Sequence, residues 1–319
     1  MRIGLIDVDA SSTNKNSYPN LVLMKLSAWH KAQGDSVEWF YPLSGHFDKV
    51  YMSKVFSFTK DYEWAIDADV IEKGGTGYCI SLKDGKEVFD NTKHKELPYE
   101  IEHIMPDYSL YGITDTAYGY MSRGCPRQCS FCHVAAKEGC ISRKVADLSE
   151  FWSGQKNIVL CDPNTLACKD WRDILQQLID SKAFVDFNQG VDIRLMTPEK
   201  CELFAQVKCK VIHFAWDRYE DKAMIQPKFE LFRSKSKISD RDLRVYVLCG
   251  DRERRVLPTD LERIYWLRDN GYDPYVMIYD KASLPRGHEL KKLQRWVNNK
   301  FIFRSCDTFQ EYGRQGGTE

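Results

Sequence analysis

The stretch Gly124-Cys125-Pro126-Arg127-Gln128-Cys129-Ser130-Phe131-Cys132 places three cysteines within eight positions. Thiolates are the ligands that soft metals and iron–sulfur clusters prefer, and spacings of three and two residues let one short loop bring its sulfurs to a single inorganic centre. The number of cysteines is informative, because a closed structural zinc site needs four ligands. Three cysteines on a 4Fe-4S cluster leave one iron open to a ligand that is not protein.

The C-x3-C-x2-C spacing, with an aromatic residue just before the last cysteine, resembles the signature of the radical S-adenosylmethionine (SAM) superfamily. Ser122-Arg123-Gly124 also resembles the start of this loop in that family. The resemblance implies that Cys125, Cys129 and Cys132 hold a 4Fe-4S cluster whose open iron is chelated by SAM, and that Phe131 lies beside the adenine. It further implies reductive cleavage of SAM and an electron donor such as flavodoxin or ferredoxin.

A zinc site is the alternative interpretation of the same cysteines. Cys140 completes a C-x3-C-x2-C-x7-C pattern with four thiols. The protein would then be a zinc-binding nucleic-acid or regulatory module. The sequence has no basic face studded with aromatic residues, which disfavours this alternative.

The composition bounds the class of protein. A chain of 319 residues is long enough to bury a large core. Lys plus Arg and Asp plus Glu both number 46, so no net field draws nucleic acid or an anionic membrane to the protein. The sequence has eleven cysteines, an odd number, and no apolar leader. Both features argue against a disulfide framework and for a reducing cytoplasm. We expect a cytoplasmic protein with no membrane or nucleic-acid partner.

The first 80 residues are predicted to form a Rossmann-like parallel sheet domain, because strand and helix patterns alternate along them. The expected elements are strands at 3–8, 36–40 and 49–58, a helix at 21–30, and a strand at 68–77 that runs into a glycine-rich turn. This order resembles the cobalamin-binding-like domain that precedes many radical SAM barrels, which implies cobalamin. The D-x-H-x-x-G motif that ligates cobalt is absent, so either the corrin is held without a histidine or the domain keeps only the fold. We favour the second.

The glycine-rich turn Gly74-Gly75-Thr76-Gly77 has two interpretations. Glycines let a backbone approach a phosphate or a flat cofactor, and they also form plain tight turns.

Residues 81–116 are predicted to be an irregular linker, residues 117–305 a barrel and residues 306–319 a C-terminal tail. Six strand–helix units follow one another in the barrel region, too few for a closed eight-fold barrel. The fold class is therefore α/β, with the Rossmann-like domain followed by an open (β/α)6 partial TIM barrel. The six expected strands are 117–122, 157–161, 183–187, 210–215, 243–248 and 274–279.

Polar residues follow these strands, where the loops of a parallel barrel face the active site. We assign Asp162 and Asn164 to SAM or substrate, because their place resembles the Asp-rich variant of the family's ammonium-binding stretch. Arg194 is assigned to the SAM carboxylate, which a guanidinium fork matches, and Gly250 to close backbone approach to adenine. Other rim positions are Asn188, Gln189, Asp192, Asp217, Asp251, Asp280 and Lys281.

The sequence thus predicts an enzyme that cleaves SAM reductively and abstracts hydrogen from an unidentified small-molecule or macromolecular substrate. A cobalamin-dependent radical SAM methyltransferase is the first alternative. The tRNA methylthiotransferases are excluded, because they need three N-terminal cysteines and only Cys79 precedes Cys125.

Overall fold

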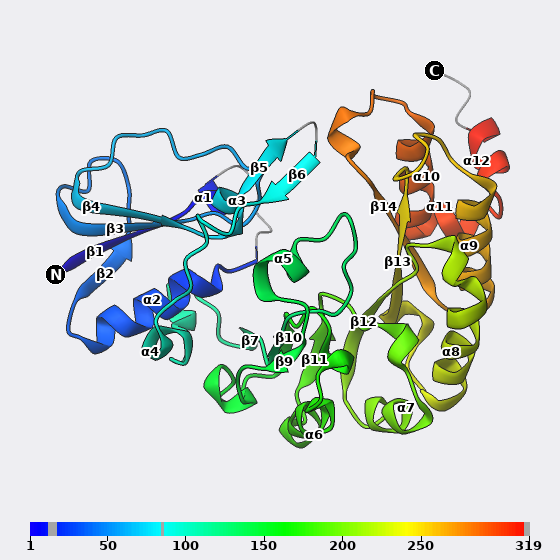
Figure 1. Ribbon diagram of the computed structural model, residues 1–319, viewed down its shortest axis with the longest axis horizontal. Helices are drawn as coiled ribbons and strands as arrows, with labels where there is room; N and C mark the ends of the chain where they lie inside the picture. Colours follow the sequence, from blue (N-terminus) through cyan, green and yellow to red (C-terminus); the bar gives the residue numbers. More distant parts are fainter. Residues whose placement is uncertain (12–17, 84–85, 316–319) are drawn as a thin grey trace. The chain divides into compact units, whose positions relative to one another are not determined.

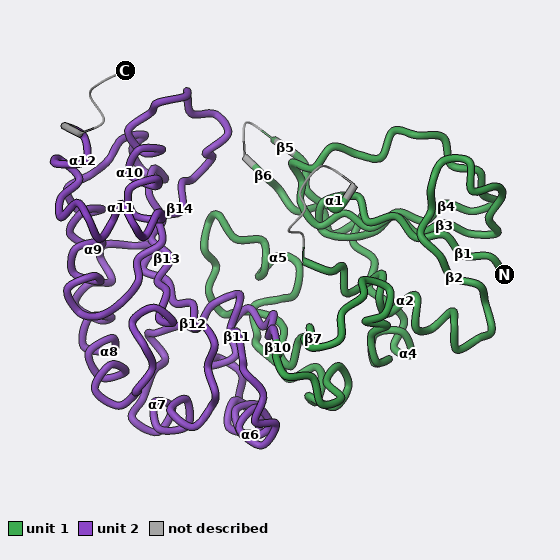
Figure 2. The backbone as a smooth tube through the Cα atoms, turned by 180° about the vertical axis from the view of Figure 1, so that it is seen from behind, with its two compact units in different colours: residues 1–158 green, residues 159–319 purple. Residues whose placement is uncertain are grey.

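A computed structural model describes residues 1–11, 18–83 and 86–315 (Figure 1). The chain divides into two units, unit 1 at residues 1–158 and unit 2 at residues 159–319 (Figure 2).

Unit 1 is built on a four-stranded parallel sheet in the order β2-β1-β3-β4. Its strands are β1 (Arg2–Asp7), β2 (Ser36–Trp39), β3 (Phe47–Ser53) and β4 (Ala68–Gly74). The predicted parallel, Rossmann-like sheet is confirmed. Among the described residues of unit 1, one long helix accompanies it, α2 (Leu21–Ala32), which Asn20 caps by accepting from the Leu23 backbone N–H at 3.2 Å. The connections from β2 to β3 and from β3 to β4 contain no helix among the described residues.

Each face of this sheet has its own core. Ile3 and Leu5 of β1 pack with Leu23 and Leu26 of α2 on one face. The opposite face buries a second cluster, Ile6, Val8, Phe40, Phe47, Val50 and Met52. Alternate residues of β1 thus enter different cores, which explains the continuous apolar run of that strand.

The glycine-rich turn after β4 packs closely against the chain itself. Gly75 has φ +99°, and a Cβ built there would lie 2.4 Å from the Lys54 carbonyl oxygen. A Cβ on Gly77 would lie 2.7 Å from the Phe56 carbonyl oxygen, while its own N–H donates to the Lys54 carbonyl at 2.9 Å. Close approach of two backbone segments therefore accounts for these glycines, as in the tight-turn interpretation.

The expected irregular linker contains regular structure. Helix α3 (Thr76–Cys79) leads into an antiparallel hairpin of β5 (Ile80–Lys83) and β6 (Lys86–Phe89). Asp84 and Gly85 lie outside the described residues. The prediction of an irregular connection was wrong here, because the short strands alternate too briefly to show a period.

A six-stranded sheet runs in the order β14-β13-β12-β11-β10-β7, so each strand lies beside its neighbour in the chain. This confirms the predicted partial barrel. The pairings among β11, β12, β13 and β14 are parallel. The strands are β7 (Thr116–Gly119), β10 (Asn157–Leu160), β11 (Phe184–Phe187), β12 (Cys209–Ala215), β13 (Leu243–Cys249) and β14 (Asp273–Ile278).

In unit 2, helices cover one face of these strands (Figures 1 and 2). Phe214 of β12 contacts Phe229 and Phe232, with ring centroids 5.7 and 5.2 Å apart. The helices of unit 2 are α6 (Trp171–Ser181), α7 (Pro198–Phe204), α8 (Lys222–Lys235), α9 (Pro258–Asp269), α10 (Glu289–Asn298), α11 (Lys300–Ser305) and α12 (Phe309–Gln315).

Helix caps test two sequence predictions. Thr197 caps α7 as predicted, with Pro198 in the first turn. The predicted capping box of Thr259 and Glu262 is wrong: the N-cap of α9 is Leu257, two residues earlier, and Asp260 accepts from the Leu257 backbone N–H at 2.9 Å.

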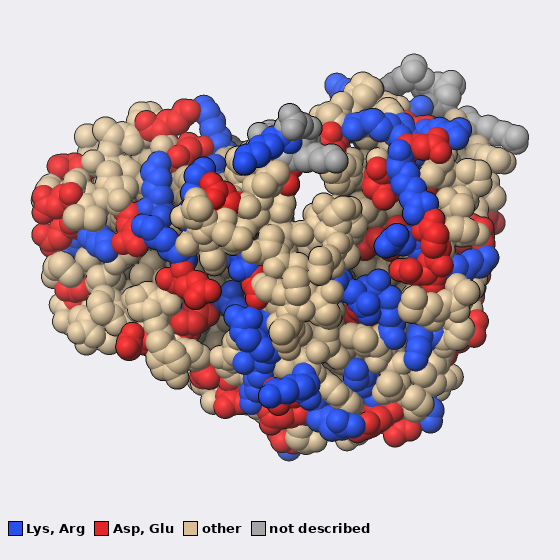
Figure 3. Space-filling view, in the orientation of Figure 1, with Lys and Arg blue, Asp and Glu red and all other residues tan. Residues whose placement is uncertain are grey.

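Acidic and basic side chains are interspersed on the face drawn in Figure 3, as the balanced composition predicts. No helix in the described ranges is long and apolar enough to cross a membrane.

Candidate functional site

The three-cysteine loop is closed at its base by a short antiparallel ribbon. Strand β8 (Ser122–Arg123) pairs with β9 (Arg143–Lys144), and the intervening residues include helix α5 (Val134–Glu138). The Cys125 N–H donates to the Gly139 carbonyl at 3.1 Å, which ties the first cysteine to the end of α5. The Cys132 N–H donates to the Cys129 carbonyl at 3.0 Å and forms a tight turn between the other two.

The backbone at the start of this loop requires a glycine at position 124. Its φ is +87°, and an added Cβ would lie 2.2 Å from the Ile141 carbonyl oxygen. Its N–H donates to Glu138 Oε2 at 3.1 Å, and Glu138 Oε1 lies 3.6 Å from Arg123 Nη1. Glu138 therefore holds the residues on which the cysteine loop begins.

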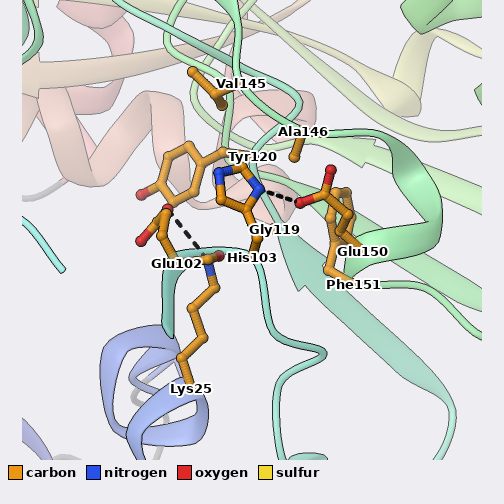
Figure 4. A pocket seen from close by; sticks show the side chains of 9 residues that line it. All are labelled: Lys25, Glu102, His103, Gly119, Tyr120, Val145, Ala146, Glu150 and Phe151. Atoms are coloured by element: carbon orange, nitrogen blue, oxygen red, sulfur yellow. Dashed lines mark hydrogen bonds and ion pairs between the residues drawn. The ribbon is translucent and has the colours of Figure 1, made fainter. Parts of the chain in front are cut away.

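A network in unit 1 fixes Arg123 from the other side, and Figure 4 draws three of its members, Lys25, Glu102 and Tyr120. Glu102 accepts from Arg123 at 3.0 Å and pairs with Lys25 Nζ at 3.1 Å. The Arg123 guanidinium stacks 4.2 Å from the centroid of the Tyr120 ring. Lys25, Glu102 and Tyr120 also line a cavity of about 20 Å³, enough for one water molecule. The network therefore braces the ribbon and is no substrate site.

All three cysteines are reachable from solvent. Cys132 is exposed, Cys125 and Cys129 are partly exposed, and none of the eleven cysteines forms a disulfide. Phe131 beside Cys132 is 37% exposed. No three His, Cys, Asp or Glu side chains in the described part of the chain converge closely enough to hold a metal ion. The fit of a cluster thus rests on the donor set, three thiols on one accessible loop, which suits 4Fe-4S.

In unit 2, several predicted polar residues meet after strands β10 and β11. Asp162 and Asn164 are buried, at 3% and 2% exposure. Asn164 Nδ2 lies 3.5 Å from Asp192 Oδ2, and Arg194 Nε donates to Asp192 Oδ1 at 2.7 Å. Asp192, which the sequence placed only on the rim, therefore joins Asn164 and Arg194 into one cluster. Asp162 accepts from Thr165 Oγ1 at 3.3 Å and lies next to this cluster in sequence.

Two buried cations hold the loops at the strand ends. Lys200 Nζ donates to the Leu166 and Leu195 carbonyls, both at 3.1 Å, and so links the loops that follow β10 and β11. Arg263 donates to the Trp216 and Asp217 carbonyls, both at 2.7 Å. Neither residue was predicted from the sequence, because the pattern of a helix does not distinguish a buried cation from an exposed polar residue.

Asp217, two residues after the end of β12, is a carboxyl group with a shifted titration. Burial raises the pKa of Asp217 to about 6, against the opposing charge of Arg263. A carboxyl group with this pKa exchanges its proton near neutral pH.

Gly250 ends β13 in a left-handed turn with φ +82°. A Cβ on Gly250 would lie 2.8 Å from Leu290 Cδ1 of α10. Turn geometry and packing therefore explain this glycine within unit 2.

The sheet face opposite the helices carries an aromatic row that the sequence prediction missed. His213 of β12 stacks on Tyr246 of β13 at 5.2 Å and 11°, and Tyr246 meets Tyr275 of β14 edge-on at 5.8 Å. His213 Nδ1 lies 3.1 Å from the Phe187 carbonyl and so carries the proton. Burial lowers the pKa of His213 to about 4, so the ring is neutral at pH 7. Alternation along 210–215 and 243–248 could have placed these residues on one face.

The carboxyl edge of the unit 1 sheet, where Rossmann-like domains bind ligands, is contacted by the unit's own residues. Tyr111 donates to Asp7 at 2.7 Å, and Thr59 donates to Asp9 at 2.6 Å. Most histidines of unit 1 are also paired with carboxylates, namely His30 with Asp35, His46 with Asp67, His103 with Glu150 and His133 with Glu87. A corrin here would be held without the histidine motif.

No protein-family model matches the sequence, and no curated protein does. Several solved structures match the fold, among them TsrM and OxsB. TsrM from Kitasatospora setae, a radical SAM methyltransferase with bound cobalamin and [4Fe-4S] cluster, has a TM-score of 0.56 and 11% identity over 87% of this chain and 72% of that chain. The chain shares its fold with a radical SAM enzyme. OxsB, a cobalamin-dependent SAM radical enzyme with aqua-cobalamin and SAM bound, matches with TM-score 0.55 and 12% identity over 95% of this chain. This chain spans 56% of the length of OxsB. Both matches support the predicted two-part fold.

Proposed function

We propose that this protein is a radical SAM enzyme that binds a 4Fe-4S cluster through Cys125, Cys129 and Cys132. The observation that carries the proposal is the C-x3-C-x2-C loop on a fold shared with two radical SAM enzymes. When bound, such a cluster supplies the electron that cleaves SAM, and hydrogen abstraction from an unidentified substrate follows. Residues 117–305 form the catalytic barrel in this proposal, residues 81–116 connect it to a domain at 1–80, and residues 306–319 are a tail.

The residues of the chain bind and orient SAM in this proposal. Gly124 and Glu138 hold the cysteine loop in place, and Phe131 gives the adenine an apolar neighbour. Arg194, whose Nε donates to Asp192 and whose Nη1 lies 3.4 Å from Asp221 Oδ2, takes the SAM carboxylate with its remaining N–H donors. Asp162 and Asn164 supply polar groups to SAM or substrate, and the Gly250 backbone adjoins the adenine.

The test is reconstitution with iron and sulfide under anaerobic conditions, followed by dithionite and SAM. The proposal predicts release of 5'-deoxyadenosine by the wild-type protein and by Cys140→Ala. Cys129→Ala is predicted to release none. A wild-type protein that holds the cluster and leaves SAM intact contradicts the proposal.

Cobalamin-dependent methyl transfer is the second candidate. It is favoured because both similar structures hold cobalamin. The parallel sheet of unit 1 is the domain that would bind the corrin, without the D-x-H-x-x-G ligand.

An absorption spectrum of protein incubated with hydroxocobalamin and then desalted distinguishes the candidates. A retained corrin band, with methyl label passing from SAM to a product, supports methyl transfer. Protein that releases 5'-deoxyadenosine and retains no corrin supports hydrogen abstraction alone.

A further inference from the structure

A basic segment stands out in the otherwise neutral chain. Residues 281–304 contain seven Lys or Arg and a single acidic residue, Glu289. They form the turn after β14, helix α10 and the start of α11. A local excess of this size creates a positive potential that the neutral total conceals.

Part of this segment lines an open depression of about 730 Å³ within unit 2. That volume lies in the range of small-ligand sites. The lining residues used below are Tyr275, Lys281, Lys291, Arg295 and Phe301.

The amides in the depression are already used by the protein. Gln294 Nε2 donates to the Val276 carbonyl at 2.9 Å, and Asn298 accepts from the Val276 N–H at 2.8 Å. These bonds cover the backbone of β14, the edge strand of the sheet. Asn299 caps α11 by accepting from the Phe301 N–H at 3.2 Å, which fixes the backbone at Phe301.

Two cationic side chains of the depression are not used in this way by the protein. In the described ranges, the side chains of Lys281 and Arg295 make no hydrogen bond and no ion pair, and both are exposed. Lys291 Nζ donates to the Leu284 carbonyl at 2.6 Å. The depression thus presents two uncompensated positive charges, which suit an anion.

The turn that carries Lys281 is held in an unusual conformation. Asp280 has φ +46°, a left-handed value that non-glycine residues adopt at a cost. Arg254 Nη1 lies 3.3 Å from Asp280 Oδ2, and Arg254 also donates to Ser283 Oγ. Lys281 therefore sits on a tethered turn rather than a loose loop.

Aromatic rings accompany the cations. Phe301 is 90% exposed, although a large apolar side chain normally avoids water. Tyr275 adds a second ring and connects the depression to the row of Tyr246 and His213. Cations beside an exposed ring are the combination that binds a phosphate attached to a base.

We propose that this depression binds the phosphate ester of a nucleotide, with Lys281 and Arg295 on the phosphate and Phe301 against the base. The nucleotide is either free or part of a single strand, since both offer the same phosphate and ring. The site lies within unit 2, uses none of the cysteines and does not depend on SAM cleavage.

Calorimetric titration of the full-length chain in about 0.1 M salt tests the proposal. The probes are AMP, inorganic phosphate, a single-stranded RNA of about eight nucleotides and a glutamate-rich peptide. Lys281→Ala and Arg295→Ala are each expected to weaken nucleotide binding about tenfold. Phe301→Ala is expected to weaken AMP binding about tenfold and leave phosphate binding within about twofold.

Lys292→Ala is the matched control, because Lys292 is an exposed cation on α10 that does not line the depression. AMP binding with this pattern identifies a free nucleotide, and RNA binding alone with this pattern identifies a strand. The proposal is overturned if neither AMP nor RNA binds at millimolar concentration, or if the acidic peptide binds more tightly than both. An equal loss in Lys292→Ala also overturns it.

Discussion

Gly124→Ala offers a sharp test of how the cysteine loop is built, because Gly139 provides a matched control in the same loop. Both glycines have positive φ, +87° and +92°. A positive φ costs an alanine about 1–2 kcal/mol at Gly124, and about 1–3 kcal/mol at Gly139, whose ψ of 167° places it in a region that glycine almost alone adopts. At Gly139 an added Cβ meets nothing within 4 Å, whereas at Gly124 it would lie 2.2 Å from the Ile141 carbonyl oxygen.

The difference between the two variants isolates this steric clash. Relief of an overlap of this kind costs about 1–3 kcal/mol, as for other overpacked sites. We therefore expect Gly124→Ala to lower the free energy of unfolding by about 2–5 kcal/mol and Gly139→Ala by about 1–3 kcal/mol. Displacement of Gly124 also strains its N–H bond to Glu138, at 3.1 Å, and the adjacent bond from Cys125 to Gly139.

Urea unfolding measures the free energies, and iron analysis after anaerobic reconstitution measures the state of the loop. Gly124→Ala is expected to retain less than half of the wild-type iron, and Gly139→Ala nearly all of it. Equal iron in both variants, together with equal unfolding free energies, would refute the role assigned to the contact between Gly124 and Ile141.

Three further predictions concern unit 2. Arg263→Met should lower the free energy of unfolding, measured in urea, by about 3–5 kcal/mol, because it leaves Asp260, whose side chain is 4% exposed, as an unpaired buried charge. The double variant with Asp260→Asn should recover part of this loss. Acidification from pH 7 to 4 should lower the free energy of unfolding by up to about 3 kcal/mol through His213, because its pKa of about 4 in the folded protein lies below the unfolded value of 6.5. Protonation therefore favours the unfolded chain. His213→Gln should flatten this part of the plot of unfolding free energy against pH, and an unchanged plot contradicts the assignment. Under the proposed function, Arg194→Lys should raise the KM for SAM about tenfold and change kcat less than about twofold in an assay of 5'-deoxyadenosine release, because lysine lacks the planar guanidinium. An unchanged KM would show that Arg194 does not bind SAM.

The sequence was sufficient for the fold where long apolar strands alternate with helices. Strands 210–215 and 243–248 were predicted within two residues of β12 and β13, because each is a buried apolar run. The β5–β6 hairpin was missed, since its four-residue strands are too short for a period to emerge. The cap of α9 was assigned to the wrong residue because Asp260 and Glu262 both fit the local pattern.

The site was predictable only in part. Cysteine spacing identified the loop, because three thiols on one short loop can reach a single cluster whatever the packing of the rest of the chain. Asp192 and Arg194 were both named, but the contact of Asp192 with Asn164 depends on how two loops pack. Lys200 and His213 were missed, since one acts through backbone carbonyls and the other through a face of the sheet.

Iron analysis of the cysteine variants tests the central claim most directly. The account predicts about four irons and no zinc per chain after anaerobic reconstitution, with the iron lost in Cys125→Ala, Cys129→Ala and Cys132→Ala and kept in Cys140→Ala. One zinc per chain that requires Cys140 as well as the other three would contradict it.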